Sequence, residues 1–170
     1  KLIGDKTNEA RASISIGNIY AIKGNYAEAL SIFFTALKIY EEYDDKEGIA
    51  NAYTNIANAY TQQNNYIDGL RYLNMALSLS KQIGVMGIIK SSYESLAKID
   101  CMQGNYQQAL LHYKLFITYR DSIQNAETAN KTATLQLQYD TEKKEQQITH
   151  LTKESKLQQA ELQKQNTTRN

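Results

Sequence analysis

The sequence contains no proline and no tryptophan, and it has a single cysteine, Cys101. One cysteine excludes an internal disulfide and any zinc site built from several cysteines. The sequence also lacks a run of roughly 18 apolar residues, the minimum for a membrane-spanning helix. Residues 1–123 hold 12 basic and 12 acidic side chains, so they lack the positive excess that nucleic-acid phosphates require.

What the sequence does contain is a repeated phrase: GNYAEAL at 24–30, NNYIDGL at 64–70 and GNYQQAL at 104–110, at intervals of 40 residues. An interval of this length is typical of helix pairs that stack, because one pair cannot bury its apolar stripe alone. The helical spacing of Leu30, Phe33 and Leu37 fits this interpretation. We therefore expect an all-α fold with three repeats, which span residues 9–46, 47–84 and 85–123.

Each repeat is expected to be a hairpin of two amphipathic helices. The Gly-Asn or Asn-Asn pair between them tolerates left-handed backbone angles and ends the first helix. Small residues recur at one position in each helix, where they allow the paired helices to approach closely. These positions are Gly17, Ala57 and Ala97 in the first helices and Ala29, Gly69 and Ala109 in the second helices.

The repeated positions resemble the tetratricopeptide repeat family. The residues that carry the resemblance in the second repeat are Tyr53, Ile56, Ala57, Tyr60, Gly69, Leu73 and Ala76, and those in the third are Tyr93, Leu96, Ala97, Ala109 and Tyr113. The resemblance implies a right-handed α-α superhelix that binds proteins or peptides without catalysis. The period of 40 exceeds the family's usual period of about 34 residues, which implies longer helices.

The resemblance also implies a concave groove lined by the first helix of each hairpin. The positions that would face it are Arg11, Asn18, Ile22, Asn51, Asn55, Asn58, Gln62, Ser91, Lys98 and Met102. Asparagine amides both donate and accept hydrogen bonds, so they can pair with the backbone of an extended peptide. Arg11 and Lys98 can meet carboxylates. The alternative is that these polar side chains only solvate an open helical surface.

The two ends of the chain differ from the repeats. KLIG at 1–4 aligns with KQIG at 81–84, so residues 1–8 are expected to be the tail of a preceding repeat and a linker. Residues 124–170 hold nine glutamines and no glycine, which predicts one long exposed helix. This helix either caps the last repeat or forms a homodimeric coiled coil. The candidate seam of this coiled coil consists of Leu137, Thr141, Lys144, Ile148, Leu151, Ser155, Gln158 and Leu162. Half of these positions are apolar, which is too few for a strong coiled coil.

The stretch RDSIQNAETANKTATLQLQYDTEKKEQQI at 120–148 is similar to the segment that links tetratricopeptide arrays to a membrane helix in bacterial sensor proteins. Histidine kinases of two-component systems and helix-turn-helix regulators have this arrangement. The resemblance implies the sensor domain of a signal-transduction protein, on the periplasmic side of a bacterial membrane. The alternative is a cytoplasmic adaptor or scaffold that dimerises through its C-terminal helix.

The sequence shows no catalytic constellation, so we expect no enzyme, cofactor or bound metal. His112 and His150 have no partner at metal-ligand spacing, and each is expected to be a surface histidine. The acidic residues between 41 and 47 lack the alternating oxygen ligands of a calcium loop, so a solvated loop is expected there. Cys101 is expected to be buried or to line the groove, since no general base can be placed beside it.

Overall fold

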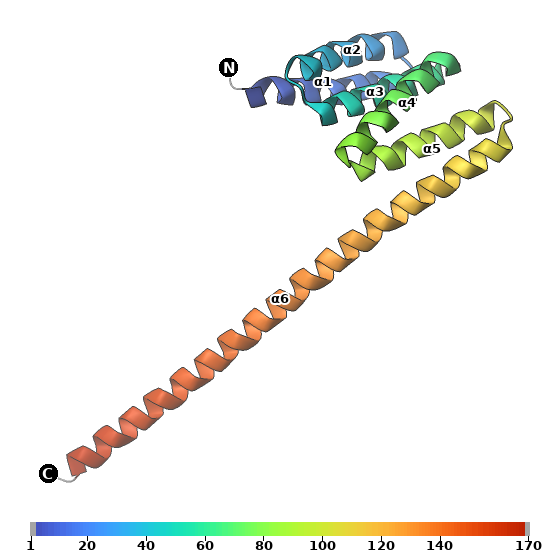
Figure 1. The fold of residues 1–170 in the computed structure, drawn as a ribbon. Helices are drawn as coiled ribbons and strands as arrows, with labels where there is room; N and C mark the ends of the chain where they lie inside the picture. Colours follow the sequence, from blue (N-terminus) through green and yellow to red (C-terminus); the bar gives the residue numbers. More distant parts are fainter. Residues whose placement is uncertain (1–2, 169–170) are drawn as a thin grey trace. The chain divides into compact units, whose positions relative to one another are not determined.

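The computed structural model describes residues 3–168, with side chains for residues 6–156, 158 and 159. Within this range every regular element is a helix, as the sequence predicts (Figure 1). The helices are α1 (Ile3–Ile22), α2 (Tyr26–Glu42), α3 (Lys46–Gln62), α4 (Tyr66–Ile83), α5 (Met86–Met102) and α6 (Tyr106–Thr168). Three hairpins, α1–α2, α3–α4 and α5–α6, follow from this order.

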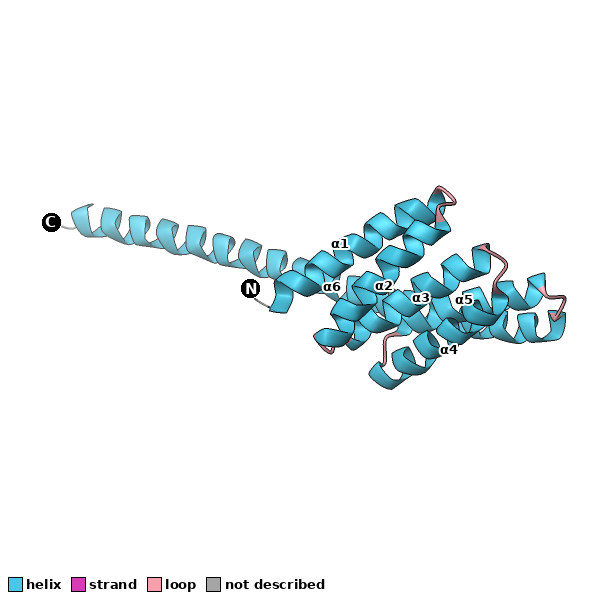
Figure 2. Ribbon diagram, turned by 90° about the horizontal axis from the view of Figure 1, so that it is seen from above, coloured by secondary structure: helices cyan, strands magenta, loops and turns pink. Residues whose placement is uncertain are grey.

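The chain divides into two compact units, residues 1–123 and residues 124–170. In the first unit, α1 to α5 each pack on the neighbouring helix along the chain, and short loops connect them (Figure 2). Helix α5 contacts α6 through the rings of Tyr93 and Tyr119, whose centroids are 5.7 Å apart. The first helices of successive hairpins also pack on one another, α1 on α3 and α3 on α5. In the second unit, every described side chain of the α6 helix is exposed.

The turns inside the hairpins follow the predicted backbone geometry. Gly24, Asn64 and Gly104 adopt positive φ angles of 81°, 60° and 78°, at the same position of each repeat. This region is costly for residues with a Cβ, and glycine and asparagine tolerate it best. The prediction of left-handed turns is confirmed. Asp44 and Gly84 end the second helices in the same way, with φ of 51° and 75°.

Side-chain caps fix where the helices of the second hairpin begin. Asp45 accepts a hydrogen bond from the backbone N–H of Gly48 at 2.9 Å, at the start of α3. Asn65 accepts from the backbone N–H of Asp68 at 3.3 Å and donates to the Asp68 carboxylate at 2.8 Å, at the start of α4. These bonds satisfy backbone donors that have no partner within the helix.

The core of the first unit, residues 1–123, consists of two apolar clusters, one at each junction between hairpins. The first surrounds Phe33 and includes Leu37 of α2 and Ile56 of α3. The second surrounds Leu73 of α4 and Leu96 of α5. Gly17 lies so close to the Phe33 ring that a Cβ there would overlap it. Gly17 therefore allows close approach of α1 and α2, as predicted for this position.

The described start of the chain belongs to the first helix. Helix α1 begins at Ile3 and runs unbroken to Ile22, so residues 3–8 are its first turns. That residues 1–8 are the tail of a preceding repeat and a linker stays a prediction. Residues 1–2 lie outside the described part of the chain.

Candidate ligand-binding groove

A hollow of about 710 Å³ opens across the first helices of the three hairpins. Its lining comes mostly from α1, α3 and α5, with Tyr26 and Phe33 contributed by α2. The lining residues are Asn18, Ala21, Ile22, Tyr26, Phe33, Asn55, Asn58, Ala59, Thr61, Gln62, Ser91, Glu94, Ser95 and Lys98. We refer to this hollow as the groove.

The groove contains most of the residues that the family resemblance placed there. Asn18, Asn55, Asn58, Gln62 and Lys98 line it, together with Ile22 and Ser91. Arg11, Asn51 and Met102 do not line it. The structure therefore brings the amides of α1 and α3 and the lysine of α5 together around one hollow.

Arg11 and Asn51 have other surroundings. Arg11 lies close enough to the Tyr40 hydroxyl, on the second helix of its own hairpin, to affect the pKa of that group. Burial raises the pKa of Tyr40, and the Arg11 charge partly opposes this shift. The backbone carbonyl of Asn51 accepts a hydrogen bond from the side-chain amide of Asn55 at 3.0 Å.

The groove has a polar wall. The Ser95 hydroxyl donates to the Asn58 amide oxygen at 3.0 Å, which joins α5 to α3 across the groove. Glu94 and Lys98, one turn apart on α5, place both signs of charge beside this bond. An extended peptide can meet donors, acceptors and either charge along this wall.

The groove also has an apolar floor that sequence reasoning missed. It includes Ala21, Phe33 and Ala59. Phe33 and Ala59 are 1% and 2% exposed, so their edges form the base of the hollow while most of their surface is in the core. The helical spacing in the sequence identified Phe33 as a packing residue, and that signal does not reveal which core residues reach the groove.

The prediction that His112 is a surface residue is wrong. Its side chain is 17% exposed, and its Nδ1 lies 2.7 Å from a carboxylate oxygen of Asp100, which is itself buried. The repeat explains this placement, because His112 occupies the position of Tyr72 and Asp100 that of Tyr60. The rings of Tyr60 and Tyr72 stack with centroids 5.9 Å apart. One inter-helix contact thus takes two chemical forms in neighbouring hairpins.

Two other predictions concern single residues on α5 and α6. Cys101 is exposed and does not line the groove, so its expected placement is wrong. His150 is exposed as expected, with Nδ1 3.6 Å from Glu154. Among the described residues, no cluster of three or more histidine, cysteine or acidic side chains is placed to hold a metal ion.

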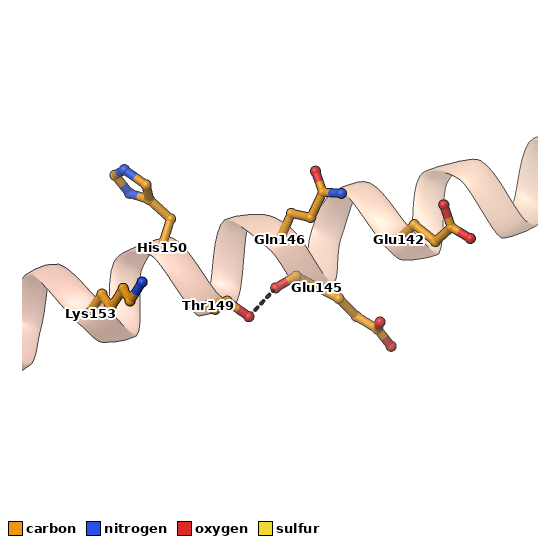
Figure 3. Close-up of a pocket in the computed structure, with 6 residues that line it drawn as sticks. All are labelled: Glu142, Glu145, Gln146, Thr149, His150 and Lys153. Atoms are coloured by element: carbon orange, nitrogen blue, oxygen red, sulfur yellow. Dashed lines mark hydrogen bonds between the residues drawn. The ribbon is translucent and has the colours of Figure 1, made fainter.

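A second hollow lies on α6 in the tail unit (Figure 3). Its lining residues all belong to this one helix: Glu142, Glu145, Gln146, Thr149, His150 and Lys153. All six are exposed, and the hydrogen bond from the Thr149 hydroxyl to the Glu145 carbonyl, 2.8 Å long, stays within the helix. It is a furrow between side chains of a single helix. None of the described helices combines the length and apolarity that a bilayer span needs.

Comparison with known proteins supports the family suggested by the sequence. The tetratricopeptide repeat family model matches residues 8–82. Among solved structures, the tetratricopeptide domain of Arabidopsis FLU matches with a TM-score of 0.63 and 20% sequence identity, over 69% of this chain and 98% of that one. No curated protein matches the chain.

At 20% identity the likeness to the FLU domain shows the fold alone. It agrees with the right-handed superhelix of three hairpins expected from the resemblance, and it confirms that expectation. The family model ends before α5, so the third hairpin is assigned through its 40-residue period and its helix boundaries. Residues 8–82 match the tetratricopeptide repeat family model, and residues 1–123 have the fold of a tetratricopeptide domain.

Proposed function

We propose that this chain is a non-catalytic module that binds an extended peptide or protein segment in the groove. The observation that carries the proposal is the convergence of amide side chains from α1 and α3 with Ser95 and Lys98 from α5 around one hollow. Amides satisfy the N–H and C=O groups of a peptide backbone independently of its sequence. The apolar floor accepts a small apolar side chain between these polar contacts.

Peptides selected from a random-sequence display library against residues 1–170 test this proposal. Asn55→Ala and Lys98→Ala are expected to weaken the selected peptides about tenfold each, since each removes a polar partner worth roughly 1.4 kcal/mol. Asn51→Ala is the matched control, because it removes an asparagine from the same helix outside the groove. Equal loss in Asn51→Ala and Asn55→Ala, or no loss in either groove variant, contradicts the proposal.

We further propose that the module is the sensory input region of a bacterial signal-transduction protein and lies on the periplasmic side of its membrane. The similarity of residues 120–148 to the linkers of such sensors supports this. Occupation of the groove then changes the curvature of the array and the seating of the tail helix, provided that the ligand favours one seating over the other.

The gene that encodes the chain tests the sensor proposal. An apolar stretch of about 20 residues soon after residue 170, followed by a kinase or DNA-binding domain, is the expected result. A reading frame without such a stretch contradicts it.

A cytoplasmic adaptor that dimerises through the C-terminal helix is the second candidate. The exposed Leu137, Ile148 and Leu151, which lie on the candidate seam of the tail, favour it. Sedimentation of residues 1–170 beside residues 1–123 tests this candidate. The adaptor predicts a dimer that disappears when residues 124–170 are removed, whereas equal masses per chain in both samples contradict it.

A further inference from the structure

The side-chain amide of Asn58 is held by a helix other than its own. The Ser95 hydroxyl of α5 donates to Oδ1 of Asn58 at 3.0 Å, and this bond uses the single proton of the hydroxyl. Among the described residues, Nδ2 of Asn58 has no hydrogen-bond partner. Because Asn58 lines the groove, its two N–H hydrogens are the part of the amide that remains for a ligand.

Asn55, which lies one turn before Asn58 on α3, is held at the opposite end of its amide. Its Nδ2 donates to the Asn51 carbonyl at 3.0 Å, within the helix. No described residue donates to its Oδ1, so this oxygen remains as an acceptor in the groove. Residues three apart on a helix are neighbours, with Cβ atoms about 5–6 Å apart. Helix α3 therefore presents an acceptor at Asn55 and, close to it, a donor at Asn58.

The junction of α1 and α3 differs in this respect, although the same repeat positions line the groove there. Asn18 and Asn55 occupy at this junction the positions that Asn58 and Ser95 occupy at the junction of α3 and α5. Asn55 donates to its own helix, and no hydrogen bond joins it to Asn18, which is also a described residue. The orientation of the Asn58 amide thus depends on Ser95 and not on the repeat position alone.

We propose that Ser95 is a positioning residue that fixes the polarity of the groove, so that Asn55 accepts from the N–H and Asn58 donates to the C=O of one peptide residue. In an extended chain these two groups of one residue point to the same side, so neighbouring amides can hold both. A peptide in the reverse direction brings its C=O to the Asn55 oxygen and its N–H to Nδ2 of Asn58, where like groups meet. The groove therefore takes an extended peptide in one direction.

This inference rests on the proposed peptide binding, and one part of it is tested without a ligand. Nuclear magnetic relaxation of ¹⁵N in the side-chain amides reports how freely each amide moves. The Asn58 amide is expected to be restricted in residues 1–170 and in Ser95→Thr, which keeps the hydroxyl, and to become mobile in Ser95→Ala. The Asn18 amide is the internal control and is expected to be mobile in all three. An Asn58 amide as mobile as that of Asn18 in the unaltered chain overturns the proposal.

Two variants that add the same charge test the assigned roles with the tightest peptide from the display library. Asn58→Asp keeps an oxygen for the Ser95 hydroxyl but replaces the donor by an acceptor, so it is expected to weaken the peptide at least about tenfold. Asn55→Asp keeps the acceptor and is expected to weaken the peptide less than about threefold. Ser95→Ala is expected to weaken it about threefold, because the Asn58 amide is then no longer preorganised, and Ser95→Thr is expected to restore the affinity.

Backbone esters in the peptide identify the N–H that Asn55 accepts, because an ester removes one N–H and leaves the side chains unchanged. One ester position is expected to weaken binding about tenfold in the unaltered chain and little in Asn55→Ala, while its effect persists in Asn58→Ala. A scan in which no position is coupled to Asn55 in this way overturns the inference.

The outcomes separate this inference from the proposed function. If the selected peptides are weakened by Asn55→Ala and Lys98→Ala but not by Asn51→Ala, the groove binds peptides as proposed. Equal losses in Asn55→Asp and Asn58→Asp in that case overturn the assigned polarity alone. A library that yields no binding peptide overturns the proposed function and, with it, this inference.

Discussion

The helices of the third hairpin begin 40 residues after those of the second, at equivalent repeat positions. The contacts between the two helices nevertheless differ from one hairpin to the other. The second packs against a neighbour on each side, and its α3 and α4 helices meet through the stacked rings of Tyr60 and Tyr72. The third has a repeat on one side only, and α5 meets α6 through the buried Asp100 and the partly buried His112. The repeat period therefore fixes where helices lie, while the chemistry of each contact varies from hairpin to hairpin.

The largest expected difference concerns the covered and uncovered apolar faces. Leu73→Ala is expected to destabilise the chain by about 2–5 kcal/mol, because it leaves a cavity in a fully buried cluster. Leu110→Ala is the control, because Leu110 on α6 is 55% exposed, and it is expected to change the free energy of unfolding little. Urea unfolding followed by circular dichroism, at a concentration where the chain is monomeric, measures both. Similar losses in the two variants would mean that the third hairpin is covered as the second is.

The buried pair of the third hairpin gives the next largest effect. His112→Ala is expected to cost about 1–3 kcal/mol, because it leaves the Asp100 carboxylate buried without its partner. His150→Ala removes a histidine that is 73% exposed and is expected to leave the unfolding midpoint unchanged. Equal midpoints for the two variants would exclude a structural role for the pair.

Replacing Asp100 and His112 with the tyrosines of the second hairpin tests whether these two positions form one contact. Asp100→Tyr combined with His112→Tyr recreates in the third hairpin the ring pair of the second. If the two positions form one contact, the double variant is more stable than the sum of the two single changes predicts. Additive losses would show that the positions act independently.

Replacing glycine by alanine is expected to change the stability by a smaller amount, and the sign of the change depends on the φ angle of the glycine. Gly104→Ala is expected to cost about 1 kcal/mol, because Gly104 has a φ of 78° that a residue with a Cβ adopts at a penalty. Gly87→Ala lies in α5 with open space around its Cβ, and it is expected to stabilise the helix by about 0.5–1 kcal/mol. Thermal unfolding of the two variants measures this pair. Shifts of the same sign would contradict the assigned turn geometry.

The smallest expected effect concerns a single buried hydroxyl. Ser92 in the third hairpin occupies the position of Ala52 in the second, is fully buried, and its hydroxyl has no hydrogen-bond partner. Ser92→Ala is expected to stabilise the chain by up to about 1 kcal/mol, because it removes an unsatisfied polar group. Ser80→Ala is the control, since that equally buried hydroxyl donates to the Leu77 carbonyl at 3.1 Å. A clear loss of stability in Ser92→Ala would reveal a partner for its hydroxyl.

The period and the glycine and asparagine turns were sufficient to predict the hairpins, because they depend on local backbone preferences and on spacing. The exposure of Ile16 was not predictable in this way. Its repeat position matches the buried Ile56, and only the presence of a neighbouring hairpin distinguishes the two. The contact between Asp100 and His112 was also missed, because a separation of 12 residues brings side chains together only once a hairpin forms.

The groove could be predicted only in part for a similar reason. Asn55, Asn58 and Lys98 were identified through the family resemblance, and they line the hollow. Arg11 was placed there as well, but it does not line the hollow, and its charge instead lowers the pKa of Tyr40 on α2, in opposition to the larger effect of burial. Partners across a helix interface are set by packing, which one repeat position does not encode.

Native-state hydrogen exchange of the monomeric chain tests most directly whether hairpins depend on their neighbours. Amides of α3, which has a hairpin on each side, are expected to exchange most slowly, and those of residues 106–123 in α6 distinctly faster. Residues 124–168, exposed along their length, are expected to exchange fastest. Protection in residues 106–123 equal to that of α3 would contradict the account, because it would mean that a hairpin is stable without a neighbour to cover it.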